Sequence, residues 1–207
     1  MKTAFGFLIS GLVATSLLFT SCTKEFSNDD PISKTYMPTV FVGSNHKLVY
    51  ALDATTGARN WEYMAEAVLS GAPLILEDAV LLTLTNGTLI KLDKLTGEVK
   101  YQRALSLPIA SIPVLHKNSI YLGAGNDIFQ IDPNTMDFLD TVTITGNVTT
   151  SPVIGSIRGL EGEYLFATTA NSTIHAINME SLVNVWNSSP GANIGFESAP
   201  CLDGDSA

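Results

Sequence analysis

Two stretches of the sequence carry one pattern: ALDATTGARNW, from Ala51 to Trp61, and KLDKLTGEVKY, from Lys91 to Tyr101. Each has Leu-Asp, then Thr-Gly, and then an aromatic residue eight positions after the Asp. The two copies of this Asp are 40 residues apart. A repeat of this length predicts that one structural unit is built several times along the chain.

The same pattern returns twice more, with some residues replaced. The segments LVYALD, TLIKLD, DIFQID and TIHAIN each alternate between apolar and polar residues, and they end at Asp53, Asp93, Asp132 and Asn178. These four positions are 40, 39 and 46 residues apart, and an inserted loop, SIRGLEGE, explains the longest interval. The aromatic residue is kept in three copies, as Trp61, Tyr101 and Trp186. The third copy has Asp140 in that place.

Each unit contains four short strands separated by turn residues. In the second unit the expected strands are 71–76, 79–84, 88–93 and 98–103. Tight turns between alternating segments predict antiparallel pairing. The Asp or Asn that ends each third strand can accept hydrogen bonds from the backbone two residues on, while Gly57 and Gly97 supply the positive φ that the next turn needs. These residues are therefore expected to form turns.

Four antiparallel strands repeated every 40 or so residues predict an all-β fold, a β-propeller of four-stranded antiparallel blades. About four blades are expected between residues 38 and 207. The aromatic residue falls on the outer strand, so we expect Trp61, Tyr101 and Trp186 to dock between blades. A Trp that buries roughly 150 to 250 Å² there contributes about 4 to 6 kcal/mol as an upper estimate.

The innermost strand of each blade has small residues before a Pro, in SGAP, ASIP, TTSP and ESAP. The other three strand types first occur near Thr39, before any inner strand. All four strand types are therefore present in equal number, but the chain begins with the second strand of a blade and ends with an inner strand. This order has two possible explanations. Either 198–202 completes the first blade and closes a ring of four, or the chain is the front of a longer propeller. We favour the second and expect truncation at the C-terminus, with an apolar blade face bare at each end.

The first 22 residues, MKTAFGFLISGLVATSLLFTSC, place Lys2 before an apolar stretch too short for a membrane span. Small residues before Cys22 resemble the signal of bacterial lipoproteins, in which the Cys is acylated and the leader removed, although Phe19 stands where that signal prefers Leu. The resemblance implies a signal peptide at 1–21 and a lipidated Cys22 with a flexible tether at 22–37. An ordinary secretory leader is the alternative.

Charge and cysteine content restrict which partners and which cellular location are expected. Twenty acidic and eleven basic residues give a net charge of −9 without a basic run, which excludes nucleic acid as a partner. If Cys22 carries lipid, Cys201 has no disulfide partner, so a hydrophobic core must hold the domain. Thr23, where lipoproteins retained in the inner membrane have Asp, favours lipid anchoring to the outer membrane of a bacterial cell envelope, on the periplasmic side or at the surface.

No pattern in the chain predicts catalysis, a cofactor or a metal site. His46, His116 and His175 have neither HxxxH spacing nor a Cys pair beside them, as a zinc site would need. The acidic clusters SNDD and LDGDSA lack the spacing of a calcium loop. There is no nucleophile elbow and no phosphate-binding Gly loop. We therefore expect no catalytic, cofactor-binding or metal-binding residue.

The stretch from Ala51 to Trp61 resembles the tryptophan-docking repeat of the quinoprotein (PQQ-dependent) dehydrogenase propellers, with Ala, Asp, Thr-Gly and Trp all in place. That repeat also builds non-enzymatic propellers, among them the BamB-like lipoprotein of outer-membrane β-barrel assembly, which the leader also resembles. For an enzyme, the resemblance would require adjacent cysteines, a Trp stacked on the quinone, and Glu, Asn and Asp around calcium. The chain has no adjacent cysteines, and both Trp residues fall on docking positions.

The expectation for function is therefore a membrane-anchored, exported propeller without enzymatic activity. It would act as a protein-interaction scaffold in outer-membrane or cell-envelope assembly, with unidentified envelope proteins as partners. Two alternatives stay open: the chain is the N-terminal part of a PQQ-dependent dehydrogenase-like propeller, or it belongs to a glycan-binding propeller.

Overall fold

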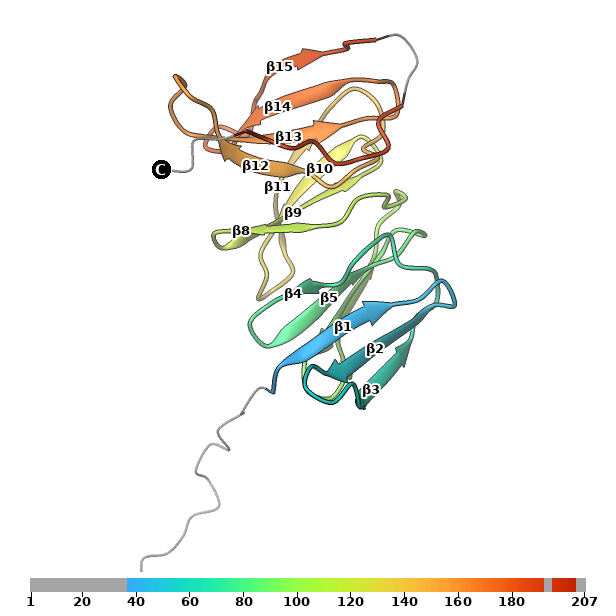
Figure 1. Ribbon diagram of the computed structural model, residues 1–207. Coiled ribbons are helices and arrows are strands. Elements are labelled where there is room, and N and C mark those ends of the chain that lie inside the picture. Colours follow the sequence, from blue (N-terminus) through green and yellow to red (C-terminus); the bar gives the residue numbers. More distant parts are fainter. Residues whose placement is uncertain (1–36, 192–194, 204–207) are drawn as a thin grey trace, which may run out of the picture. The chain divides into compact units, whose positions relative to one another are not determined.

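The computed structural model describes residues 37–191 and 195–203, and in this part of the chain all regular secondary structure is β (Figure 1). The predicted signal peptide, Cys22 and nearly all of the tether lie outside the described residues. Within those residues no helix is long and apolar enough to cross a membrane.

The described strands form four antiparallel sheets, each made from consecutive strands. The first sheet contains β1 (Thr39–Gly43), β2 (Leu48–Asp53) and β3 (Arg59–Met64). The second contains β4 (Leu74–Ile75), β5 (Ala79–Thr83), β6 (Thr88–Asp93) and β7 (Val99–Ala104). The third contains β8 (Val114–His116), β9 (Ser119–Ala124), β10 (Asp127–Ile131) and β11 (Phe138–Thr143). The fourth contains β12 (Val153–Ser156), β13 (Glu163–Thr168), β14 (Ile174–Asn178) and β15 (Asn184–Ser188).

The predicted fold class is confirmed: the protein is all-β, with four antiparallel sheets of three or four strands that correspond to about four propeller blades. The strands of the second sheet lie where the repeat placed them, except that the innermost, β4, is only two residues long, Leu74–Ile75, where 71–76 was expected. Pro73 precedes β4 directly and has no N–H to donate to a ladder, which limits the strand.

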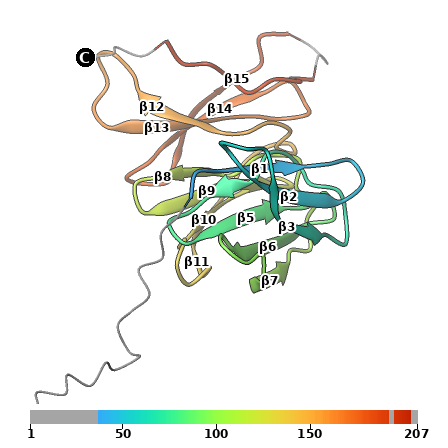
Figure 2. The ribbon, with the colours of Figure 1, turned by 60° about the horizontal axis from the view of Figure 1, so that its bottom comes forward.

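The core lies between successive sheets, which follow one another in chain order (Figure 2). One cluster of buried side chains joins the first and second sheets, another joins the second and third, and another joins the third and fourth. Strands β5 and β9 are buried along their whole length because both faces of their sheets are covered. This is why Ala79–Thr83 reads as a continuous apolar run and not as an alternation.

All four sheets have an irregularity at the same place, where the third strand of the repeat pairs with the outer strand. The register shifts between Ala51/Leu52, Lys91/Leu92, Gln130/Ile131 and Ala176/Ile177. Each shift lies directly before the Asp or Asn that opens the next turn. A bulge at this point bends the outer strand and increases its twist.

The first sheet has three strands in the described residues, and β1 is at its inner edge. Residues 198–202 form no ladder with β1. Leu202 instead packs against the cluster of Tyr164, Phe166 and Ala176 on the outer face of the fourth sheet. In the described residues, therefore, 198–202 does not pair with β1 to close a ring of four blades, which was the first of the two explanations of the strand order.

Candidate functional site

The turn after the third strand of each unit is built by one side-chain oxygen. Asp53 Oδ1 accepts hydrogen bonds from the backbone N–H groups of Thr55 and Thr56 at 2.9 and 2.8 Å. The equivalent oxygens make the same pair of contacts in the other three units: Asp93 with Leu95 and Thr96, Asp132 with Asn134 and Thr135, and Asn178 with Glu180 and Ser181. The backbone hydrogen bonds lower the pKa of the Asp53 carboxyl from its ordinary value.

The position four residues after this Asp or Asn has positive φ in all four units. Gly57 and Gly97 have φ of 73° and 75°, as the sequence led us to expect. Met136 and Leu182 adopt the same conformation, with φ of 63° and 53°, although they are not glycines. An L-residue there carries strain of about 1 to 3 kcal/mol. The turn is therefore kept where the Thr-Gly pair is lost from the sequence.

The junction between the first and second sheets is centred on Trp61. Its indole Nε1 donates a hydrogen bond of 3.2 Å to the carbonyl oxygen of Lys94, which lies in the turn of the second sheet. The ring packs against Gly97 of the same turn and lies 5.7 Å, centroid to centroid, from the ring of Phe41. Trp61 is only 8% exposed. It thus links its own sheet to the turn of the next one.

Between the second and third sheets, different side chains donate hydrogen bonds to the carbonyl oxygens of the equivalent turn. The hydroxyl of Tyr101 donates to the carbonyl oxygen of Met136 over 3.5 Å, a long contact. The ammonium of Lys91 donates to the carbonyl oxygens of Pro133 and Asn134 at 2.8 and 3.1 Å, and this Lys is buried. Lys91 was not among the residues predicted from the sequence. The available signal was a lysine at an inward position of the apolar strand TLIKLD.

In addition to the buried apolar cluster, ionisable side chains connect the third and fourth sheets. His116 Nε2 and Lys117 Nζ lie 2.9 and 2.7 Å from Glu163 Oε2. Hydrogen bonds from Lys117 and then from His116 lower the pKa of the Glu163 carboxyl. Here the outer strand has Asp140 in the docking position of Trp61, so the contact is made by the turn between β8 and β9 instead.

His175 is fully buried on β14 of the fourth sheet. Its Nε2 lies 3.2 Å from the carbonyl oxygen of Thr145, in the segment that leads from the third sheet, and its Nδ1 lies 3.1 Å from the side-chain amide of Asn184. Burial lowers the pKa of the imidazole, and the contacts with Thr145 and Asn184 oppose this effect. The imidazole is therefore a structural group that connects β14 to β15 and to the segment that leads from the third sheet.

Trp186 occupies in the fourth sheet the position that Trp61 has in the first. It packs against Phe166, with ring centroids 6.1 Å apart, but 39% of it is exposed. Among the described residues no further sheet covers this face, and the indole N–H has no hydrogen-bond partner there. The described residues therefore contain the docking side chain but no turn that covers it.

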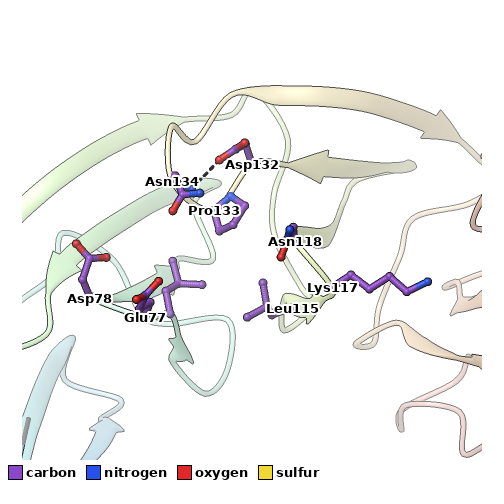
Figure 3. A pocket seen from close by; sticks show the side chains of 9 residues that line it. Glu77, Asp78, Leu115, Lys117, Asn118, Asp132, Pro133 and Asn134 are labelled. Carbon is purple, nitrogen blue, oxygen red and sulfur yellow. Dashed lines mark hydrogen bonds between the residues drawn. The ribbon is translucent and has the colours of Figure 1, made fainter.

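An open pocket lies between the second and third sheets, where the repeated turn at 132–134 meets the β4–β5 turn and the β8–β9 turn (Figure 3). Its volume is about 360 Å³. It is lined by Leu76, Glu77, Asp78, Leu115, Lys117, Asn118, Asp132, Pro133 and Asn134. Three of these residues are acidic, and Figure 3 shows the side chain of Lys117 extending away from Glu77 and Asp78.

Most charges in and near this pocket are already compensated. Lys100 Nζ lies 2.8 Å from Asp78 Oδ2 and 2.9 Å from Asp93 Oδ2. Although burial raises it, hydrogen bonds from Lys100 and the turn backbone lower the pKa of Asp93 to about 2. Asp132 accepts the N–H groups of its own turn, and Lys117 pairs with Glu163. The pocket can accommodate a ligand or a partner side chain, but it holds no pair of groups arranged for proton transfer.

The residues present do not fit the quinone and calcium site that the dehydrogenase resemblance would require. The indole of Trp61 is enclosed in a sheet junction and hydrogen-bonded to backbone, so it cannot stack on a quinone. Within residues 37–191 and 195–203 no three His, Cys, Asp or Glu side chains gather as metal ligands.

Comparison with solved structures places the fold among β-propellers. The structure of BamB from Moraxella catarrhalis has a TM-score of 0.63 and 21% identity, over 73% of this chain and 46% of that chain. Quinohemoprotein alcohol dehydrogenase from Comamonas testosteroni has a TM-score of 0.62 and 16% identity, over 78% and 35%. The computationally designed Ika8 protein has a TM-score of 0.62 and 14% identity, over 80% and 50%. At these identities the likeness shows the fold alone.

The chain spans about a third to a half of the length of these solved structures. No curated protein matches it. A family model matches residues 36–207, which is well over half of the chain, and that model is described as outer membrane protein assembly factor BamB. The chain therefore belongs to this BamB-like family of PQQ-like β-propeller repeat proteins.

Proposed function

We propose that the protein is a non-enzymatic scaffold that binds other proteins of the bacterial cell envelope and takes part in outer-membrane or envelope assembly. The observation that carries the proposal is the use of the buried polar side chains. Trp61, Lys91 and His175 are each committed to backbone or side-chain groups at a sheet junction, so they serve the framework. The membership of the chain in a family described by an assembly factor supports the same conclusion.

The surface that remains for partners consists of the loops at the ends of the sheets. The pocket between the second and third sheets is one concave part of it, and Glu77, Asn118 and Asn134 line it from three different turns. Loops held by a rigid framework are where binding residues usually lie. A partner with basic or amide side chains would suit this acidic, hydrogen-bonding rim.

The proposal includes export and a lipid anchor at Cys22, with the chain attached to the outer membrane. Acyl chains on one Cys contribute about 0.8 kcal/mol per buried methylene, enough for stable attachment when several are present. The test is metabolic labelling with radioactive palmitate followed by membrane fractionation. The unchanged chain is expected to carry label in the outer-membrane fraction, and Cys22→Ala to lose both the label and the membrane association. Label on Cys22→Ala would contradict the anchor.

Partner binding is tested by photo-crosslinking in intact cells. A photoreactive residue at Asn118, on the pocket rim, is expected to give adducts with integral outer-membrane proteins, identified by mass spectrometry. The matched control places the same residue at Val99, which is exposed on β7 outside the pocket. Equal adducts at both positions, or none at Asn118, would contradict binding at this rim.

A second candidate function is part of a quinone-dependent dehydrogenase, because a quinohemoprotein alcohol dehydrogenase is among the structures with this fold. Titration of the purified protein with PQQ and calcium, followed by absorbance, separates the two candidates. The scaffold predicts no saturable binding. Saturable binding that requires calcium would favour the dehydrogenase.

A further inference from the structure

The pocket between the second and third sheets is bounded by sheets that are packed on both faces. The second sheet packs against the first and the third, and the third packs against the second and the fourth. Its walls are therefore fixed by the hydrophobic core of the described domain. Its volume of about 360 Å³ is large enough to take one long side chain from another molecule.

Glu77 brings an uncompensated carboxylate to this pocket. Asp78 pairs with Lys100, and Asp132 accepts the N–H groups of its own turn. In the described residues, however, the exposed carboxylate of Glu77 takes part in no hydrogen bond and no ion pair. The place beside it is therefore open to a cation from another molecule.

The repeat shows that the next junction has a basic group of its own at this place. Glu77 follows Pro73 by four residues, and Lys117 follows Pro113 by four residues, so the two positions are equivalent. At the junction of the third and fourth sheets, Lys117 places its ammonium 2.7 Å from the carboxylate of Glu163. At the junction of the second and third sheets the equivalent residue is acidic, so this turn supplies no ammonium.

The turn at 132–134 binds one ammonium group from inside the molecule. Lys91 Nζ lies 2.8 and 3.1 Å from the carbonyl oxygens of Pro133 and Asn134. On the pocket side, the same turn presents the side-chain amide of Asn134, and the β8–β9 turn presents that of Asn118. Neither side-chain amide forms a hydrogen bond with another described residue, so both amide oxygens can accept one from a partner.

The pocket also has an apolar part, made by Leu76, Leu115 and Pro133, and Leu115 is 40% exposed. Figure 3 shows Glu77 and Asn118 on opposite sides of the pocket, with Pro133 and Leu115 between them. A side chain with an apolar stem and a cationic head matches this arrangement. Arginine fits better than lysine, because its planar guanidinium is weakly hydrated and has five donors, enough for one carboxylate and two amide oxygens together.

We propose that this pocket binds one arginine side chain of a partner protein. The guanidinium pairs with the carboxylate of Glu77 and donates hydrogen bonds to the amide oxygens of Asn118 and Asn134. The methylene groups of the arginine pack on Leu115 and Pro133. The inference rests on the proposed function, because it names the side chain by which the partner is held at this rim.

The first experiment measures binding of a model side chain to the isotope-labelled full chain in detergent. The probe is a capped Gly-Arg-Gly tripeptide, and the control probe has citrulline, which is neutral and of the same shape, in place of the arginine. The arginine probe is expected to shift the backbone NMR signals of Asn118 and Asn134 saturably, and the citrulline probe to bind about fivefold more weakly. No saturable shift, or equal affinity of the two probes, would overturn the proposal.

The second experiment locates the binding with two matched substitutions. Glu77→Gln and Glu98→Gln each remove one exposed carboxylate and leave the same net charge, but Glu98 does not line the pocket. Glu77→Gln is expected to raise the dissociation constant of the arginine tripeptide about fivefold, and Glu98→Gln to leave it unchanged. Equal effects of the two substitutions would assign the binding to the acidic surface as a whole and overturn the proposal.

The arginine site and the proposed function fail in different measurements. The tripeptide assay contains no envelope protein, so it tests the site alone, whereas photo-crosslinking at Asn118 tests the partner. Tripeptide binding without envelope adducts would support the arginine site and contradict the proposed function. Envelope adducts without tripeptide binding would support the proposed function and overturn the arginine site.

Discussion

The indole ring of Trp61 and the α-carbon of Gly97 are in such close contact that a β-carbon on residue 97 would lie 2.8 Å from two ring atoms. The same Gly has a φ of 75°. One residue therefore meets two demands, since the turn needs its backbone conformation and the neighbouring sheet needs its small size.

This contact predicts that two Gly→Ala substitutions, both at positions with positive φ, lower the free energy of unfolding by different amounts. Gly57→Ala is expected to lower the free energy of unfolding by about 1 kcal/mol, since only the positive φ is strained. Gly97→Ala is expected to cost about 2 to 4 kcal/mol, because the clash with Trp61 adds to the strain. Urea denaturation followed by Trp fluorescence measures both. Equal losses would show that Gly97 matters for its backbone alone.

A second prediction concerns the buried ammonium of Lys91. Lys91→Met keeps the length of the side chain but leaves the carbonyl oxygens of Pro133 and Asn134 without their donor. The expected loss is about 1 to 3 kcal/mol in the free energy of unfolding. Lys47→Met, which removes an exposed donor to the carbonyl oxygen of Glu66, serves as the comparison and is expected to cost about 1 kcal/mol or less. A smaller effect at Lys91 than at Lys47 would contradict the role of Lys91 in the junction.

The low pKa of Asp93 predicts a loss of stability in acid. The carboxyl has an ordinary pKa of 3.8 and a pKa of about 2 in the folded protein. Its contribution, up to about 2 kcal/mol, is therefore fully present above pH 3.8 and is lost as the pH falls through about 2. We measure the free energy of unfolding by denaturant titration at each pH. Asp93→Asn is expected to reduce the fall of this free energy over the pH window, whereas Asp137→Asn, at an exposed position, is expected to leave the fall unchanged. Parallel pH profiles for both variants would count against the Lys100 pairing.

His175 predicts a separate pH dependence at higher pH. Because burial lowers its pKa below the ordinary 6.5, the unfolded chain binds a proton more readily than the folded one. The stability from this group is complete above about pH 6.5 and declines as the pH falls through the lower folded pKa. His175→Gln is expected to remove this decline in thermal unfolding midpoints, and His46→Gln, at an exposed position, to keep it. A decline unchanged by His175→Gln would assign it to another group.

The features that could be predicted from the sequence are those set by near neighbours in the chain. Alternation, the Asp-centred turn and the 40-residue period depend on local spacing, and they were enough to predict the fold and the strands of the second sheet other than the short β4. The junction of Trp61 with Lys94 and Gly97 was also within reach, because the repeat has an aromatic residue in a fixed place.

The features that were missed depend either on contacts between units or on residues whose type does not reveal their backbone conformation. The sequence shows a Lys on an apolar strand, but it does not show that two carbonyl oxygens of the next sheet accept hydrogen bonds from Lys91. Met136 and Leu182 give no sign of positive φ, because their side chains are neither small nor turn-forming. Glu163 lies far in the sequence from His116 and Lys117, so only the stacking of the sheets brings these groups together.

Each sheet is a single uninterrupted stretch of chain, with its strands in sequence order. Tension applied to the two ends of the described domain therefore acts on the sheets in series. A sheet that is pulled loose releases only its own 40 or so residues, roughly 140 Å of extended chain. The other sheets keep their hydrogen-bonded ladders while it extends. Under mechanical load such a molecule lengthens in discrete steps and absorbs work at each one.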